Sequence, residues 1–277
     1  MVAVLEDDGH LRSFQLETGQ VLAKTVAHND TPWALATDAK QTILVTVGED
    51  RRLCCWELPS FELKFEAMLD WGVRDVCVAP DGSWIAAAPP ASSNLGQREG
   101  TIGIWNPATG KCDRILHGHT NWVVRLVASK DGTRLASASV DRTSRLWDVG
   151  DWQTKHVLSP AKQSTAEQFA FQPAANRLFI GHRDGQITSW NTDTGEPGPT
   201  WSAFGDSLSG LIADGDRLLS SSRSDSRLKV RDVRLNRTVA ELDLGMGDII
   251  NMQASPDGSV FSFMDENGRV LIRRVAP

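Results

Sequence analysis

The sequence predicts an all-β protein built from seven repeats of a unit of short antiparallel strands, on three observations. Apolar runs of five to seven residues alternate with turns rich in Gly and Asp, which is typical of short antiparallel strands. No run has both the length and the 3.6-residue period of a helix. A set of marker residues also recurs at nearly constant spacing along all 277 residues.

The repeat is clearest between His117 and Val149. A Gly-His pair at 118–119 opens this stretch, three short apolar runs separated by turns follow, and the last run ends in Trp147-Asp148. Positions equivalent to Trp147 recur in steps of 42, 49, 42, 43, 41 and 42 residues, at Phe14, Trp56, Trp105, Trp147, Trp190, Arg231 and Arg273. We call these the ruler positions.

Turn residues keep the same phase as the ruler positions. Asp-Gly turns precede the second run of several repeats, and Thr-Gly turns follow the ruler residue of others. We therefore expect repeats at approximately 1–26, 27–68, 69–117, 118–160, 161–203, 204–244 and 245–277.

The Gly-His and Trp-Asp pairs, with a period close to about 40–45 residues, resemble the WD-repeat family. The resemblance covers the whole chain and implies a single domain, a seven-bladed β-propeller of four-stranded antiparallel blades. In that family the Trp joins a buried hydrogen-bond network with the Gly-His histidine, a second-strand Ser or Thr and a turn Asp. Transferred to this sequence, the complete network is His119, Ser139, Asp141 and Trp147. The second repeat keeps His28, Asp50 and Trp56 but has Gly48 in place of the serine.

Apolar runs place the strands in chain order. The first four repeats are expected to contain strands at 2–5, 11–16 and 21–26; 27–35, 42–47, 52–56 and 61–65; 73–78, 84–88 and 101–105; and 123–127, 135–139, a run ending at 148, and 155–158. The last three are expected at 167–171, 177–180, 186–190 and a weak strand near 200; 209–213, 217–221, 227–231 and 238–242; and 251–254, 259–263 and 270–274.

The first and last repeats lack one strand each, which predicts 26 strands instead of 28. We expect the chain to be a piece of a longer protein or an incomplete ring. On that interpretation it is less stable than an extended form and prone to edge-to-edge association, because an open strand edge can pair with another chain.

Composition narrows the function classes. A net charge of −6 argues against nucleic acid as the main partner. The sequence shows no signal peptide and no apolar run long enough to span a membrane, which predicts a cytoplasmic protein without a membrane partner. The four cysteines, Cys54, Cys55, Cys77 and Cys112, lack metal-ligand spacing. We interpret them as reduced core residues, with Cys54 and Cys55 on opposite faces of one strand.

Catalysis is not expected. Gly205-Asp206-Ser207-Leu208 spells the nucleophile block of the GDSL esterase family, but no histidine that could activate the serine follows His182. The histidines show no zinc-site spacing with cysteine or carboxylate, so no metal or other cofactor is predicted. A propeller hydrolase stays open as the least favoured alternative.

Tryptophans beyond the ruler positions point to a binding surface. Trp33, Trp71 and Trp122 fall within a few residues of the Gly-His position, at the entry to the innermost strand of three successive repeats, which the resemblance places on the top face of the propeller. Trp and Arg are enriched in binding hot spots. We expect a partner-binding surface at Trp33, Trp71, Arg74, Arg98 and Trp122, beside the long connection 89–100.

The resulting prediction is a non-catalytic scaffold that binds a partner protein or peptide on the top face. The alternative is a regulatory or sensor module of a larger multidomain protein, in which a covalently linked neighbouring domain could be the partner.

Overall fold

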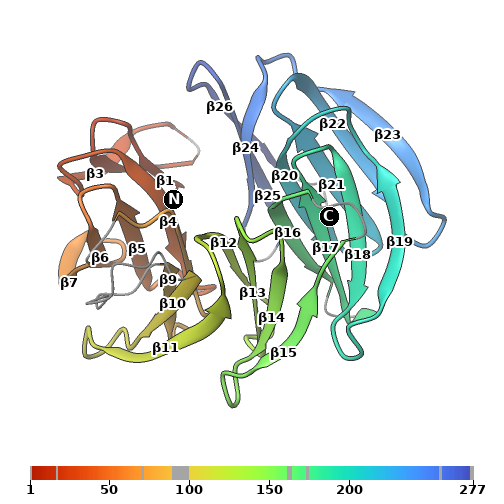
Figure 1. The fold of residues 1–277 in the computed structure, drawn as a ribbon. Helices are drawn as coiled ribbons and strands as arrows, with labels where there is room; N and C mark the ends of the chain where they lie inside the picture. The colour runs from red at the N-terminus through yellow and green to blue at the C-terminus, as the bar shows by residue number, and fades with distance from the viewer. Residues whose placement is uncertain are drawn as a thin grey trace. The chain divides into compact units, whose positions relative to one another are not determined.

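The computed structural model describes residues 2–16, 18–69, 72–88, 100–160, 164–172, 175–255 and 258–274. Their strands form seven antiparallel sheets, five with four strands and two with three, drawn as arrows in Figure 1. This confirms the predicted fold class, a seven-bladed β-propeller whose first and last blades have three strands each. The chain forms two compact units, Met1–Asp141 with Trp147–Thr154 (unit 1) and Arg142–Leu146 with Lys155–Pro277 (unit 2).

The first three blades hold eleven strands in the order of the chain. Blade 1 contains β1 (Val2–Leu5), β2 (His10–Phe14) and β3 (Val21–Val26). Blade 2 contains β4 (Pro32–Thr37), β5 (Ile43–Gly48), β6 (Arg52–Glu57) and β7 (Glu62–Met68). Blade 3 contains β8 (Asp75–Val78), β9 (Ile85–Ala88), β10 (Gly100–Trp105) and β11 (Cys112–His119).

The remaining blades follow the same order. Blade 4 contains β12 (Val123–Ala128), β13 (Arg134–Ser139), β14 (Ser144–Asp148) and β15 (Thr154–Leu158); blade 5 contains β16 (Ala166–Gln172), β17 (Arg177–His182), β18 (Gln186–Asn191) and β19 (Pro197–Ser202). Blade 6 contains β20 (Leu208–Asp214), β21 (Arg217–Ser222), β22 (Asp225–Asp232) and β23 (Arg237–Asp243); blade 7 contains β24 (Ile249–Ala254), β25 (Val260–Asp265) and β26 (Val270–Arg274). The described residues thus contain 26 strands, the number expected for seven four-stranded repeats of which two lack one strand, although the sequence analysis assigned residue ranges to only 25 of them.

Every ruler position lies at or near the end of the strand predicted for it, from Phe14 in β2 to Arg273 in β26. One strand escaped the sequence analysis. β11 forms the fourth strand of blade 3 and runs through His119, which we expected to open the next repeat. Its first three residues are exposed, so an outer strand of this kind has little of the apolar alternation that marks a strand in the sequence.

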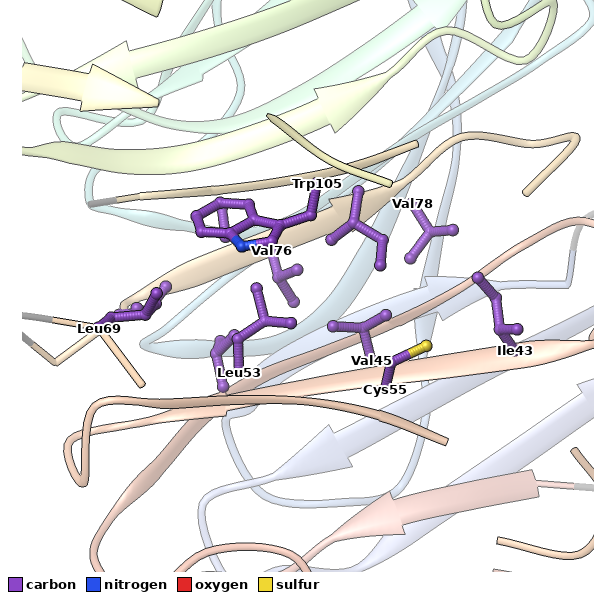
Figure 2. Packing of buried hydrophobic residues seen from close by; sticks show 12 residues of the cluster. Ile43, Val45, Leu53, Cys55, Leu69, Val76, Val78 and Trp105 are labelled. Atoms are coloured by element: carbon purple, nitrogen blue, oxygen red, sulfur yellow. The ribbon is translucent and has the colours of Figure 1, made fainter. Parts of the chain in front are cut away.

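The core of unit 1 lies between the facing sides of consecutive blades. Trp105, only 1% exposed, packs with Val45, Leu53 and Cys55 of blade 2 and with Val76 of its own blade. Figure 2 shows these side chains meeting from two sheets. A ruler Trp is therefore the large side chain that fills the space between its own blade and the blade before it.

The adjacent cysteines lie on opposite sides of β6, as expected. Cys54 packs with Leu11 and Trp56 toward blade 1, whereas Cys55 packs toward blade 3. Burial raises the pKa of Cys54 to about 12 and that of Cys55 to about 11, so both stay as unreactive thiols. All four cysteines are free, but Cys112 is exposed. The expectation that it is a core residue was wrong, because it begins the exposed outer strand β11.

In unit 2 an arginine stands at a ruler position and finds a different partner. The Arg231 guanidinium lies 4.4 Å from the centre of the Trp201 ring, which belongs to β19 of the preceding blade. Its terminal nitrogen also donates to the backbone oxygen of Asn236 at 2.6 Å. Arg is suited to this position because its planar cation can stack on an aromatic ring.

We predict that Trp105→Ala lowers the free energy of unfolding by about 3–5 kcal/mol, because it leaves a large cavity between two sheets. Leu63→Ala, at a 47%-exposed position on β7, is the control and should change that free energy by less than about 0.5 kcal/mol. Urea denaturation measures both. Equal effects of the two substitutions would contradict this account of the core.

Candidate functional site

We define the top face of unit 1 as the segments leading into β4, β8 and β12, together with the turns after β5 and β13. Backbone hydrogen bonds join these segments. The Glu49 N–H donates to the Thr31 oxygen at 2.8 Å, Val73 N–H to the Gly48 oxygen at 3.1 Å, and Val140 N–H to the Trp122 oxygen at 2.9 Å. The second of these bonds links blade 2 to blade 3. The top face is therefore supported by the backbone instead of being a set of separate loops.

A β-bulge presents Trp33 on this face. In the pairing of β4 with β5, Pro32 is opposite Gly48 and Ala34 is opposite Val47, so Trp33 is the extra residue. A bulge turns the side chain of its extra residue away from the regular alternation of the strand. The first strands of blades 4 to 7 have a register shift at the corresponding place. The sequence analysis did not foresee this feature, since a bulge leaves no periodic signal.

Trp33 is held between two charged residues. It is 42% exposed, its indole N–H donates to Oε2 of Glu49 at 2.8 Å, and the Arg74 guanidinium lies 4.8 Å from the ring centre. Gly72 makes room for this arrangement, because a Cβ on Gly72 would lie 2.8 Å from Glu49 Oε2. The contacts hold the ring in one orientation while leaving much of it in contact with solvent. We call Trp33, Glu49 and Arg74 the Trp33 cluster.

A second exposed tryptophan lies on the same face, two blades along. Trp122 is 41% exposed and Val140, beside it, is 42% exposed. Their segments are joined by the Val140–Trp122 backbone bond, and the Trp122 N–H donates to the Asn121 side chain at 2.8 Å. Of the residues predicted to bind a partner, the structure thus places Trp33, Arg74 and Trp122 on the top face of unit 1. Trp71 and Arg98, and the connection 89–99, lie outside the described residues.

Below the top face, Asp75 joins the first strands of blades 3 and 4. Its Oδ2 accepts the Leu126 N–H at 2.6 Å, and its Oδ1 lies 3.8 Å from a terminal nitrogen of Arg125. Burial raises the pKa of Asp75, opposed by the nearby charge of Arg125 and by backbone hydrogen bonds. Both carboxylate oxygens of Asp75 therefore have a partner on β12, which joins β8 to β12.

The buried network of blade 4 forms around a serine. Trp147 Nε1–H donates to Ser137 Oγ at 2.8 Å, and the Ser137 hydroxyl lies 2.8 Å from His119 Nε2. His119 Nδ1 lies 2.8 Å from Asp141 Oδ2. Because Ser137 already accepts from Trp147, it donates to Nε2, and the Nδ1 proton of His119 points to Asp141. The carboxylate also accepts the Thr120 N–H, so it anchors a segment of the top face.

The sequence analysis assigned the serine of this network to Ser139, and that assignment was wrong. Ser139 lies two residues further along β13, where its hydroxyl donates to the Asn121 oxygen at 2.8 Å and accepts the Asp141 N–H at 3.0 Å. Ser137 and Ser139 point to the same side of the strand. Only the hydrogen bonds show which of the two hydroxyls meets the histidine.

Blade 2 keeps part of this network. Trp56 Nε1–H donates to Thr46 Oγ1 at 3.0 Å, and His28 Nδ1 lies 2.8 Å from Asp50 Oδ1. Within the described residues, the buried His28 Nε2 has no hydrogen-bond partner. Gly48, which stands where blade 4 has Ser139, is required there, since a Cβ would lie 2.9 Å from His28 Nδ1 and 3.0 Å from the Thr31 oxygen.

Blade 5 builds a similar network from other positions, which the sequence analysis missed. Trp190 Nε1–H donates to Thr188 Oγ1 at 3.1 Å, and Thr188 lies 2.9 Å from His182 Nε2. His182 Nδ1 lies 3.3 Å from the Ser164 oxygen. The histidine comes from the end of β17 and the hydroxyl from β18. A search for Gly-His before the first strand therefore could not find it.

His28 and His182 favour the neutral state. Burial lowers the pKa of His28, more than its bond to Asp50 raises it. Burial likewise lowers the pKa of His182. Burial raises the pKa of Asp50, but the hydrogen bonds that it accepts from His28, Asn29 and Arg52 together outweigh burial, so the pKa lies below its usual value. The network of blade 2 is therefore arranged for a neutral His28 and a charged Asp50.

We predict that the protein loses stability as the pH falls from about 7 toward 5. The unfolded chain takes up protons at histidine near the usual pKa of about 6.5. The folded chain takes them up at His28 and His182 only at lower pH, so the free energy of unfolding decreases over this range. Urea denaturation at several pH values measures the slope. His182→Asn should reduce the slope, and His117→Asn, at an exposed position, serves as the control; a slope unchanged by His182→Asn would contradict the assignment.

Two kinds of catalytic site, a metal centre and the GDSL serine, can be compared with the described residues. Among them, no group of three or more His, Cys, Asp or Glu side chains could hold a metal ion. The Ser207 hydroxyl of the GDSL tetrapeptide donates to Glu167, so its partner is a carboxylate and not a histidine. The described residues also contain no helix with the length and hydropathy of a membrane span.

The fold and its networks define a β-propeller in which a hydroxyl accepts the N–H of a buried Trp in blades 2, 4 and 5, and also meets a His in blades 4 and 5. A family model described as "WD domain, G-beta repeat" matches residues 110–148, the stretch that contains His119 and Trp147. The match covers one repeat of the chain, and together with the seven blades it makes the chain similar to the WD-repeat family. The family fits a role as a scaffold for protein interactions.

Several longer proteins are similar to this chain. Nuclear distribution protein nudF of Emericella nidulans is 33% identical over 188 residues, which cover 61% of this chain and 41% of that protein. Apoptotic protease-activating factor 1 of Rattus norvegicus is 23% identical, over 70% of this chain and 15% of that protein. Autophagy-related protein 16 of Arabidopsis thaliana is 27% identical, over 72% of this chain and 38% of that protein. The chain thus spans less than half the length of each.

Proposed function

We propose that this chain is a non-catalytic platform that binds a partner protein or peptide through the top face of unit 1. The observation that carries the proposal is the pair of tryptophans, Trp33 and Trp122, each with about two fifths of its surface exposed. Trp is one of the largest apolar side chains and is highly buried on average. Trp and Arg are also the residue types most enriched in binding hot spots.

The support beneath these side chains favours binding. The Trp33 ring is fixed by Glu49 and Arg74, and the Trp122 segment is tied to the turn after β13. Side chains fixed before binding lose little conformational entropy when a partner arrives. A rigid aromatic surface is therefore a better docking site than an equally exposed tryptophan on a loose loop.

The relatives support a binding role more than any one process. Their names refer to nuclear distribution, to activation of an apoptotic protease and to autophagy. A propeller shared by such different proteins is expected to supply binding, while the partner and the rest of each chain supply the process.

A regulatory or sensor module of a larger protein is the second candidate. It is favoured by one observation, that the chain spans less than half the length of the relatives compared. The two candidates are compatible, because a covalently linked domain can be the partner of the top face. We place the protein in the cytoplasm, a reducing compartment that suits three buried free thiols. A propeller hydrolase finds no support in the geometry around Ser207.

The test is a comparison of binding by matched variants. We predict that Trp33→Ala with Trp122→Ala weakens partner binding by about thirtyfold or more, as expected for hot-spot residues. Leu63→Ala with Met68→Ala, at exposed apolar positions on β7, should leave binding unchanged. Partners captured from an extract of the source organism are identified by quantitative mass spectrometry, purified and titrated against each variant by calorimetry.

Urea denaturation of both double variants checks that they stay folded. If the purified partners bind the tryptophan variant as tightly as the wild-type protein, the top face of unit 1 is not the binding site.

A further inference from the structure

Arg74 differs from other arginines of unit 1 in how its charge is satisfied. Arg52 pairs with Glu66 at 2.7 Å, and Arg134 pairs with Asp148 at 2.8 Å. Arg74 is exposed and stacks on Trp33, yet within the described residues it makes no hydrogen bond or ion pair. A stacked guanidinium keeps its N–H groups in the plane of the fork, where they suit a carboxylate.

The two carboxylates of the site, those of Glu49 and Asp75, have other partners. Glu49 accepts the Trp33 indole N–H through Oε2 and packs against Gly72, where a Cβ would lie 3.0 Å from its Cα. Asp75 is buried, and its oxygens face Leu126 N–H and Arg125. No ion pair joins Arg74 to either of them among the described residues. The cluster thus presents the Arg74 cation beside an exposed aromatic ring. Among the described residues, this cation has no carboxylate partner.

We propose that the top face binds an acidic segment of its protein partner, in which an Asp or Glu carboxylate pairs with Arg74 while an apolar side chain contacts Trp33. This inference rests on the proposed function and adds the charge of the partner to it. A carboxylate can accept two parallel N–H bonds from a guanidinium, which fixes orientation as well as attraction. Glu49 has the opposite effect, since its charge lies beside the same ring and repels a second carboxylate.

A segment of a protein fits this site better than nucleic acid. The whole chain carries a net charge of −6, which repels a polyanion at long range. A short acidic segment needs only one or two local contacts. It can also bring apolar side chains to the exposed surface of Trp33, Trp122 and Val140.

The experiment selects short random peptides from a displayed library on the purified wild-type chain, with no partner needed. We predict that the selected peptides are enriched in Asp and Glu and that their binding weakens when Trp122 is replaced by Ala. Arg74→Ala should weaken the best acidic peptide by about tenfold to a hundredfold, the range for a hydrogen bond to a charged group. Fluorescence polarisation of the labelled synthetic peptide measures each Kd.

Three further variants separate charge from structure. Arg74→Lys should recover only part of the loss, because Lys keeps the charge without the planar fork. Glu49→Gln keeps an oxygen that can accept from Trp33 but removes the negative charge, so acidic peptides should bind a few times more tightly. Arg114→Ala, at an exposed arginine on β11, is the matched control and should leave Kd unchanged.

The outcomes distinguish this inference from the proposed function. Peptides that depend on Trp122 but are basic or uncharged, or that bind Arg74→Ala as well as wild type, overturn the acidic segment and leave the top face standing as a binding site. If the library yields no peptide whose binding depends on Trp33 or Trp122, both proposals fall together.

Discussion

The structure of unit 1 depends on one packing constraint, the burial of a ruler tryptophan between its own blade and the blade before it in blades 2, 3 and 4. Trp56 packs toward blade 1, Trp105 toward blade 2 and Trp147 toward blade 3. A single antiparallel sheet cannot bury both of its sides, so each blade is stable only against its neighbours. The near-constant spacing of the ruler positions follows from this requirement, because each blade must bring its large side chain to the same place.

Burying an indole also buries its N–H, and the blades satisfy that donor in different ways. Ser137 accepts it in blade 4, Thr46 in blade 2 and Thr188 in blade 5. A buried donor without an acceptor is costly, so the hydroxyl is retained even where the histidine moves or loses a partner. Where the ruler residue is Arg231, stacking on Trp201 replaces the buried indole altogether. Blades 2, 3 and 4 thus share the apolar contact of a buried Trp, and the polar contacts of the ruler residues vary from blade to blade.

The same framework prepares the surface that we propose for binding. The histidine–aspartate pairs hold the segments that lead into β4 and β12, as in the bonds from Asn29 N–H to Asp50 and from Thr120 N–H to Asp141. The bulge in β4 then turns Trp33 outward. Stability and binding are therefore linked, because the buried networks of the blades fix the backbone that carries the exposed tryptophans and Arg74.

The sequence by itself determined the fold class, the number of blades and the strand that carries each ruler residue. These follow from a spacing that repeats seven times and from apolar alternation, both of which are local signals. It also indicated Trp33, Arg74 and Trp122 as surface candidates, because they exceed what the repeat requires. It failed for β11, whose outer position weakens the alternation, and for Cys112, which lies at the exposed start of that strand.

Only the tertiary structure decided which polar atoms meet. His119 meets Ser137 and not Ser139, and His182 meets Thr188. Both contacts depend on how neighbouring strands are placed, which residue spacing along the chain does not encode. The bulge at Trp33 likewise depends on the pairing of β4 with β5. The close contact of Glu49 with Gly72 depends on the approach of two segments that are distant in the sequence. The sequence could propose Arg74 as a surface residue, but its stacking on Trp33 without an ion pair among the described residues emerges only when two blades lie side by side.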